Sequence, residues 1–353
     1  MPLLVNLIMA AVLRGALPYT VAEGGERYRY YLMHTFSPIA DCSSFHCFRI
    51  LPPLLASLMP LGTIDAFLVT GFLFQAAAGT MLWLIAEHLH GSRRVALLTI
   101  CWFWITWGPM QSFSDPLLIA DPVQAFWSFA ALYLLLTERY VAALPFLTLG
   151  AAAKESVLLV PAIYALYAWF TLERTARRLL WPALLVAVLA AAWFTLRFAL
   201  HRWFGYVTAG DGPYLRQLYF FTDWVPSLGP APGNVATAAL YMYGTFGAAW
   251  VLGAIGLRHA HRRQRMLTLA AIPAMAFLSI YQLPDRALAC FPYAILIPAA
   301  VYIRRPRRLC CRRPYIGGRH RTRGGGGPGV YHDVRALGWH LRRSAAMKVE
   351  RRQ

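Results

Sequence analysis

Long apolar stretches separated by short polar connections fill the first 303 residues of the chain. Most of them approach the roughly 20 residues that a helix needs to cross about 30 Å of hydrocarbon. The pattern therefore predicts an all-α membrane protein with about ten transmembrane helices, joined in part by loops on the outer face. The predicted spans cover residues 2–21, 63–87, 95–113, 122–136, 141–153, 156–172, 179–200, 235–257, 266–283 and 287–303.

Basic residues occupy every second connection between the apolar stretches. These connections are residues 91–94, 173–178 and 258–265, followed by the tail from Arg304. Lys and Arg accumulate in the cytoplasmic loops of membrane proteins. The pattern therefore predicts a multi-pass protein with both termini in the cytoplasm. The composition, rich in alanine and arginine, favours a bacterial plasma (inner) membrane.

Acidic residues show the complementary distribution, because only Glu87, Glu138 and Glu173 of those before Arg304 fall on the predicted inner side. Acidic residues contribute little to topology, so their accumulation outside has another cause. Two causes remain open at this point: a solvated outer surface, or an active site at the outer leaflet. The outer acids are Glu23, Glu26, Asp41, Asp65, Asp115, Asp121, Glu155, Asp211, Asp223 and Asp285.

The composition excludes a soluble protein, because 58% of the residues are hydrophobic and only 14% are charged. The net charge of +19 arises largely in the C-terminal tail, since fifteen of the 34 Lys and Arg residues lie in 304–353. We therefore expect no binding of nucleic acid. The tail lacks apolar periodicity and is predicted to be disordered. Two regions result: a transmembrane domain over 1–303 and a disordered, basic, Arg/Gly-rich cytoplasmic tail over 304–353.

Two long connections fall on the predicted outer side, at residues 22–62 and 201–234. The first ends in a largely apolar segment, residues 51–59, which is too short to span a bilayer. We expect this segment to form an interfacial helix or to re-enter the membrane. The second connection is rich in Trp, Tyr and Phe, which favour the level of the lipid headgroups.

Lys154 and Glu155 interrupt an otherwise apolar region. The stretch before them, residues 141–153, covers only about 20 Å as a helix. The two charges are therefore predicted to lie below the outer surface. Ionisable side chains at that depth usually face a cavity or a partner, and they often mark a functional site. The alternative is a mutual ion pair that closes a hairpin.

Motifs of several other enzyme classes are absent from the sequence. It contains no Walker phosphate loop, no His-Glu-x-x-His, no paired Cys-x-x-Cys and no Gly-x-Ser-x-Gly. We expect no cofactor and no metal site, and a need for a divalent metal is left open. His88 and His90 are expected to be polar interfacial residues, and Cys101 and Cys290 to be small packing residues.

Asp115 and Asp121 flank a tight turn, and each precedes a proline. Proline suits the first position of a helix, and an aspartate before it can cap the free N–H groups. Capping is thus one explanation for Asp121, and a functional role is the other. Asp115 has less structural reason to be acidic.

The order of these parts resembles the GT-C superfamily of polytopic glycosyltransferases, in its bacterial type. The resemblance covers about residues 20–303, and each of its motifs is short and degenerate. The first motif is the acidic and aromatic first outer loop with the Arg-Ile-Leu-x-Pro-like segment 49–53. The second is the turn from Asp115-Pro116 to Asp121-Pro122, which leads into a helix ending in Thr137-Glu138-Arg139. The others are the segment 149–156 running to Pro161, and Asp285-Arg286-Ala287-Leu288 before Phe291-Pro292.

The resemblance implies an enzyme that transfers a hexosyl or pentosyl unit from a polyprenyl-phosphate donor to a glycan, lipid or protein acceptor at the outer leaflet. A carboxylate would take the proton of the attacking hydroxyl, and cations would stabilise the departing phosphate. Members usually carry an Asp in an Asp-Gly-x-x-Tyr-like context after the first helix, where this chain has Glu-Gly-Gly-Glu-Arg-Tyr at 23–28. The candidates are Glu23, Glu26 or Asp41 as base, Asp115 or Asp121 as second acid, Arg49, Lys154 and Arg286 as phosphate contacts, and Glu155 and Asp285 as supporting residues.

Two other functional classes fit the same charges. A transporter or flippase would use intramembrane charges as a path for a substrate or protons, and such proteins usually consist of two related halves. No such halves are evident in the sequence. A non-catalytic membrane scaffold would use the outer loops to bind a partner, and the altered first loop is compatible with it.

Overall fold

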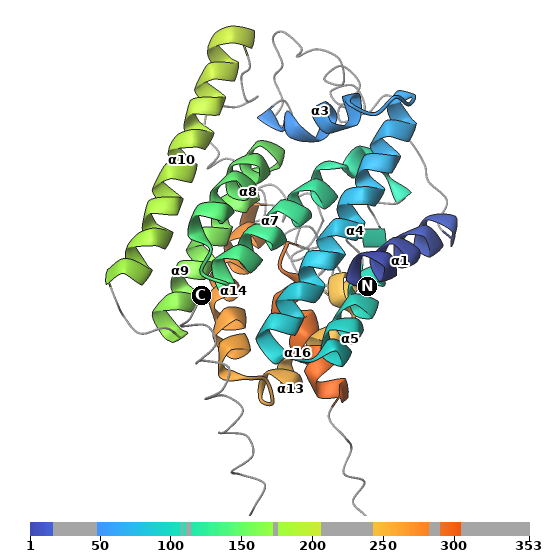
Figure 1. Ribbon diagram of the computed structural model, residues 1–353, viewed down its shortest axis with the longest axis vertical. Coiled ribbons are helices and arrows are strands. Elements are labelled where there is room, and N and C mark those ends of the chain that lie inside the picture. Colours follow the sequence, from blue (N-terminus) through green and yellow to red (C-terminus); the bar gives the residue numbers. More distant parts are fainter. Residues whose placement is uncertain are drawn as a thin grey trace, which may run out of the picture. The chain divides into compact units, whose positions relative to one another are not determined.

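The computed structural model of the chain describes residues 1–16, 48–106, 109–110, 114–171, 176–205, 243–281 and 290–304 (Figure 1). Within these ranges the regular secondary structure is entirely helical, with no strand. The predicted all-α class is therefore confirmed for the described part of the chain. The predicted disordered tail and most of both long outer connections lie outside the described residues.

Every predicted span overlaps a described helix, so the apolar pattern located the helices correctly. Their ends differ from the predicted ends by several residues in places. The helices are α1 (Pro2–Ala16), α3 (Leu51–Ser57), α4 (Thr63–His90), α5 (Arg93–Trp104), η2 (Pro116–Leu118), α7 (Ala120–Leu136), α8 (Tyr140–Ala153), η3 (Glu155–Leu158), α9 (Leu159–Thr171), α10 (Ala176–Phe204), α13 (Ala249–Leu257), α14 (Arg262–Tyr281) and α16 (Pro292–Arg304).

Three helices in the described part of the chain are long and apolar enough to cross a bilayer, fewer than the predicted ten: Thr63–His90, Pro116–Leu136 and Leu180–Phe204. Other predicted spans form apolar helices of 10–17 residues, such as Tyr140–Ala153 and Glu155–Thr171. Some predicted spans continue into residues outside the described ranges, whereas others end early within them. At Lys154, for example, the backbone becomes extended, with φ −165° and ψ 137°.

The core forms where α4 packs against α5, α7 and α1, while α16 packs against α5 and α13. Asn6 of α1 is completely buried and accepts a hydrogen bond of 2.9 Å from the indole N–H of Trp104. A Cβ atom on Gly79 would collide with the Asn6 side chain, so glycine is needed where α1 crosses α4. Small residues of this kind let membrane helices approach closely.

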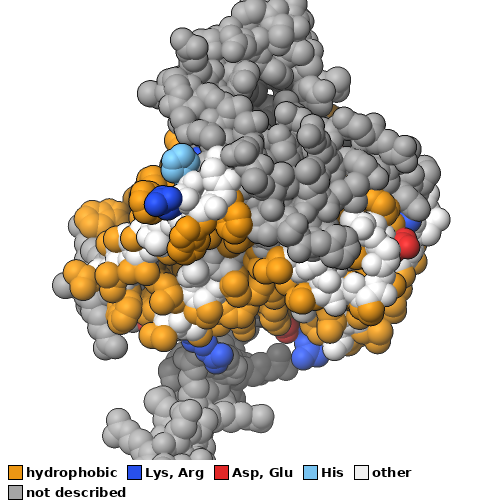
Figure 2. Space-filling view, turned by 90° about the horizontal axis from the view of Figure 1, so that it is seen from above, with side chains coloured by type: hydrophobic (Ala, Val, Ile, Leu, Met, Phe, Trp, Pro, Cys, Tyr) orange, Lys and Arg blue, Asp and Glu red, His pale blue; other side chains and the backbone are white. Residues whose placement is uncertain are grey.

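Helix α10 lies at one side of the bundle, against α8 and α9 (Figure 1). Its outward face is apolar and exposed, with Leu180, Phe194 and Phe198 each more than 60% accessible. Figure 2 shows that hydrophobic side chains cover much of the described surface in a view from above. Such a surface is costly in water and suits a hydrocarbon environment.

Candidate site of paired charges

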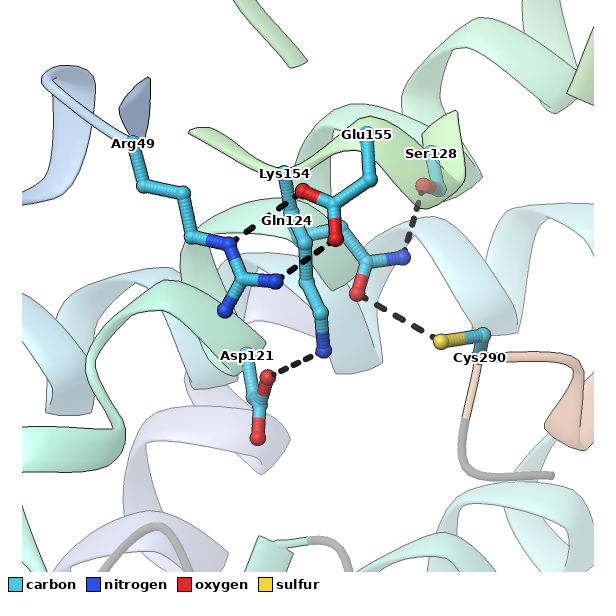
Figure 3. Close-up of polar contacts among 7 residues, drawn as sticks. All are labelled: Arg49, Asp121, Gln124, Ser128, Lys154, Glu155 and Cys290. Carbon is cyan, nitrogen blue, oxygen red and sulfur yellow. Dashed lines mark hydrogen bonds and ion pairs between the residues drawn. The ribbon is translucent and has the colours of Figure 1, made fainter. Parts of the chain in front are cut away.

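Four charged side chains from three separate parts of the sequence meet at one end of the helices (Figure 3). The Lys154 ammonium donates to Asp121 Oδ1 at 2.7 Å. Arg49 donates from one terminal nitrogen to Glu155 Oε1 at 2.6 Å and from Nε to Glu155 Oε2 at 3.2 Å. The second pair is a two-point contact, which fixes the orientation of both planar groups. We refer to Arg49, Asp121, Lys154 and Glu155 as the charge cluster.

The break between α8 and η3 places two neighbouring residues in different contacts. Because the backbone at Lys154 is extended, consecutive side chains point to opposite sides. Lys154 therefore reaches Asp121 near the start of α7, while Glu155 reaches Arg49 before α3. Lys154 and Glu155 therefore do not form the mutual ion pair that the sequence left open as an alternative.

Gly150 permits the close packing that brings these elements together. A Cβ atom at this position would lie 2.9 Å from Trp127 Cβ of α7 and 2.9 Å from Val157 Cγ1 of η3. Both distances are shorter than ordinary carbon–carbon contacts. The absence of a side chain at Gly150 thus allows α7, α8 and η3 to converge below the charge cluster.

The cations of the cluster are more deeply buried than the carboxylates. The side chains of Lys154 and Arg49 are 3% and 8% exposed, whereas those of Asp121 and Glu155 are 28% and 35% exposed. A buried cation without a counter-charge is strongly destabilising, so each carboxylate stabilises its partner.

A neutral polar network lies next to the charge cluster (Figure 3). Gln124, one turn along α7 from Asp121, donates to Ser128 Oγ at 3.2 Å. Its carbonyl oxygen accepts from the thiol of Cys290, just before α16, at 3.5 Å. The hydroxyl of Ser156 is also buried and lies near the Cys290 thiol. Sequence reasoning missed Gln124, Ser128 and Ser156, and it treated Cys290 only as a packing residue.

Asp115, and not Asp121, is the residue that caps a helix. Asp115 caps η2, because its Oδ1 accepts from the Leu117 amide at 3.0 Å. Asp121 lies within the first turn of α7, whose N-cap is Ile119 without a side-chain cap. Its carboxylate pairs with Lys154 instead of capping.

Several candidates from the sequence cannot be placed. Residues 17–47 and 282–289 lie outside the described residues, and they contain Glu23, Glu26, Asp41, Asp285 and Arg286. Among the described residues, no three His, Cys, Asp or Glu side chains are grouped in a way that could hold a metal ion.

No protein-family model and no curated protein matches this sequence. The comparison with solved structures, in contrast, finds a clear likeness. One neighbour is the oligosaccharyltransferase of Archaeoglobus fulgidus in a complex with zinc and sulfate, with a TM-score of 0.57 and 16% identity. Another is the oligosaccharyltransferase AglB of the same organism in a complex with an inhibitory peptide and a dolichol-phosphate, with a TM-score of 0.55 and 14% identity.

The chain shares its fold with an archaeal oligosaccharyltransferase. The likeness covers 86% of this chain in both comparisons, but 48% and 49% of the two neighbours, so the chain spans about half of their length. At this low identity the likeness concerns the fold alone. The shared fold agrees with the helical membrane architecture expected from the sequence, and it gives no support to the bacterial type, because both neighbours are archaeal.

Proposed function

We propose that the protein is a membrane glycosyltransferase that moves a sugar from a polyprenyl-phosphate donor to a glycan, lipid or protein acceptor at the outer leaflet. Support comes from the fold shared with an oligosaccharyltransferase, one structure of which holds a dolichol-phosphate. The observation that carries the proposal is the convergence of Arg49, Asp121, Lys154 and Glu155 in one cluster. Ionisable groups gathered among apolar helices usually serve a function.

The proposed orientation places the charge cluster outside and the opposite helix ends in the cytoplasm. At those opposite ends lie Arg93 after α4, Arg258 after α13 and Arg304 at the end of α16. Positive charge favours the cytoplasmic side. The proposal therefore includes a multi-pass protein of the plasma membrane with about ten membrane helices, some of them short, and with both termini inside.

The proposed reaction is a displacement at the anomeric carbon of the donor sugar. The acceptor hydroxyl oxygen forms the new glycosidic bond, the bond from carbon to the phosphate oxygen breaks, and the phosphate leaves with the electron pair. A carboxylate takes the hydroxyl proton, which contributes about 10²–10⁴-fold in systems of this kind. We propose Glu26, Glu23 or Asp41 as this base, with Asp121 or Asp115 as the second acid.

The proposed phosphate contacts are Arg49, Lys154 and Arg286, and Glu155 and Asp285 support them. Preorganised cations stabilise a leaving phosphate because they need no reorganisation during the reaction. In the cluster, Arg49 and Lys154 are already held by carboxylates. The carboxylates therefore fix both cations in place before a donor arrives, and the developing phosphate charge would compete with them for the same N–H groups.

A transfer assay tests the proposal. Membranes that contain Glu23→Gln, Glu26→Gln, Asp41→Asn or Asp115→Asn are supplied with a labelled polyprenyl-phosphate sugar, and label is followed into water-soluble or acceptor-linked products. At least one of the four should lose transfer by about 100-fold or more, as expected for loss of a general base. Full activity in all four would contradict the carboxylate chemistry, and movement of unchanged donor across the bilayer would favour a flippase.

A further inference from the structure

Helix α10 carries an arginine inside its apolar span. Arg197 lies seven residues before the end of the 25-residue segment Leu180–Phe204, a distance of about 10 Å along the helix. This end of α10 lies beside the segment that contains Arg49, and it is the outer end in the proposed orientation. Lys and Arg are scarce at outer helix ends, and an arginine within a span usually has a function.

Two aromatic rings hold the guanidinium of Arg197. Its Cζ lies 4.4 Å from the centroid of the Phe48 ring and 4.7 Å from that of Trp193. Leu200, one turn further along α10, is buried against Ile50 and fixes the same contact between α10 and the segment before α3. Cation–π contacts on two rings restrict the position of the charge.

Stacking is compatible with binding of an anion. The aromatic rings contact the planar faces of a guanidinium, whereas its N–H groups lie in the plane and match the geometry of phosphate oxygens. Phe48, which stacks on Arg197, is the direct neighbour of Arg49, which belongs to the charge cluster. Residues 48 and 49 therefore tie the two guanidinium groups to one short piece of backbone.

Figure 2 shows Lys or Arg and His side chains lying beside one another on the side of the molecule where α10 is found. The last two turns of α10 carry Arg197, His201 and Arg202. We propose that Arg197, positioned by Phe48 and Trp193, binds the phosphate group of a prenyl-phosphate lipid. The identity of this ligand depends on the proposed function, whereas the anion site itself does not.

Direct binding tests this assignment without any transfer reaction. Full-length protein in nanodiscs of neutral phosphatidylcholine is titrated with a short prenyl phosphate and, separately, with the corresponding prenyl alcohol. Wild type should prefer the phosphate. Arg197→Gln should bind the phosphate about ten-fold more weakly and the alcohol equally well, because one charge-assisted contact is lost. Arg202→Gln, at the exposed end of the same helix, should behave as wild type.

Further variants and lipids keep the test decisive. Phe48→Leu leaves the charge of Arg197 in place but removes one of the two rings that hold it. This variant should weaken phosphate binding several-fold. It provides a second test if Arg197→Gln does not fold. Equal affinity in Arg197→Gln and wild type, or an equal loss in Arg202→Gln, would overturn the assignment. Nanodiscs that contain phosphatidylglycerol separate the two sources of phosphate: if this phospholipid abolishes the preference for prenyl phosphate, the site binds bilayer headgroups and the donor assignment is wrong.

The outcome is independent of the transfer assay, since the binding titration contains neither sugar nor acceptor. Binding that depends on Arg197 in a protein without transfer activity would contradict the proposed function and leave the anion site standing. If the protein transfers sugar but Arg197→Gln binds the phosphate as wild type does, the proposed function stands and the anion site at Arg197 is refuted.

Discussion

Lys154 and Asp121 form the most buried ion pair in the described part of the chain, with the lysine side chain only 3% exposed. Removal of one partner from a buried pair leaves an uncompensated charge, whereas replacement of both partners by groups of similar size is far less costly. This asymmetry makes the pair accessible to a direct test of stability.

We predict that Asp121→Asn alone lowers the free energy of unfolding by about 3–5 kcal/mol, and that the double variant Asp121→Asn with Lys154→Met loses much less. Thermal and denaturant unfolding in detergent measure both. The exposed pair of Glu87 with Arg93, whose side chain is 82% exposed, is the matched control, and Glu87→Gln should cost less than about 1 kcal/mol. Additive losses in the double variant would refute the coupling.

Asp115 provides a second test at the scale of one residue, because its observed contact is a cap on η2. Asp115→Ala should cost about 0.5–2 kcal/mol of stability, and Asp115→Asn should restore most of it, since asparagine caps equally well. If capping is its whole role, Asp115→Asn also keeps full transfer activity. Loss of transfer in a stable Asp115→Asn protein would instead support the acid role proposed from the sequence.

At the scale of elements, the interruption between α8 and α9 decides where the charges lie. The sequence located this interruption through the two charges in an apolar region. It could not identify their partners, because Arg49 is 106 residues from Glu155 and Asp121 is 33 residues from Lys154 along the chain. Contacts over such separations depend on packing. The apolar pattern likewise located the helices, although only three of those in the described ranges are long and apolar enough to span a membrane.

Gly150→Ala tests how far the packing of α7, α8 and η3 supports the cluster. The added methyl group would crowd Trp127 and Val157, and overpacking of this kind typically costs about 1–3 kcal/mol. We expect lower stability and lower activity. The control is Gly71→Ala in α4, where the nearest atom lies at 3.9 Å, so the substitution should be neutral or slightly stabilising. Equal behaviour of both variants would show that the close approach at Gly150 is not needed.

At the scale of the whole molecule, the account requires that the charge cluster and the basic helix ends face opposite sides of the membrane. We predict that a cysteine introduced at Ser57, on a cysteine-free background in intact cells, reacts with a thiol reagent that does not cross membranes. A cysteine at Arg93 should react only after permeabilisation. The reverse pattern would invert the proposed orientation.

The fold class could be predicted from the sequence because the apolar pattern depends on local composition alone. The site could be predicted only in part. Lys154 and Glu155 stood out as charges in an apolar region, Asp121 through its place before a proline, and Arg49 through a segment that resembles a family motif. Gln124 and Cys290 did not, because an uncharged polar side chain in a helix has many ordinary roles, and their contact joins positions 166 residues apart.

The most direct test of the central claim is the rate of sugar transfer by the stable double variant Asp121→Asn with Lys154→Met. It should retain the fold but lack two charges of the cluster. With purified protein and a labelled polyprenyl-phosphate sugar, we predict that wild type releases polyprenyl phosphate and that the folded double variant does so at least about 100-fold more slowly. Transfer at the wild-type rate by this folded variant would contradict the account.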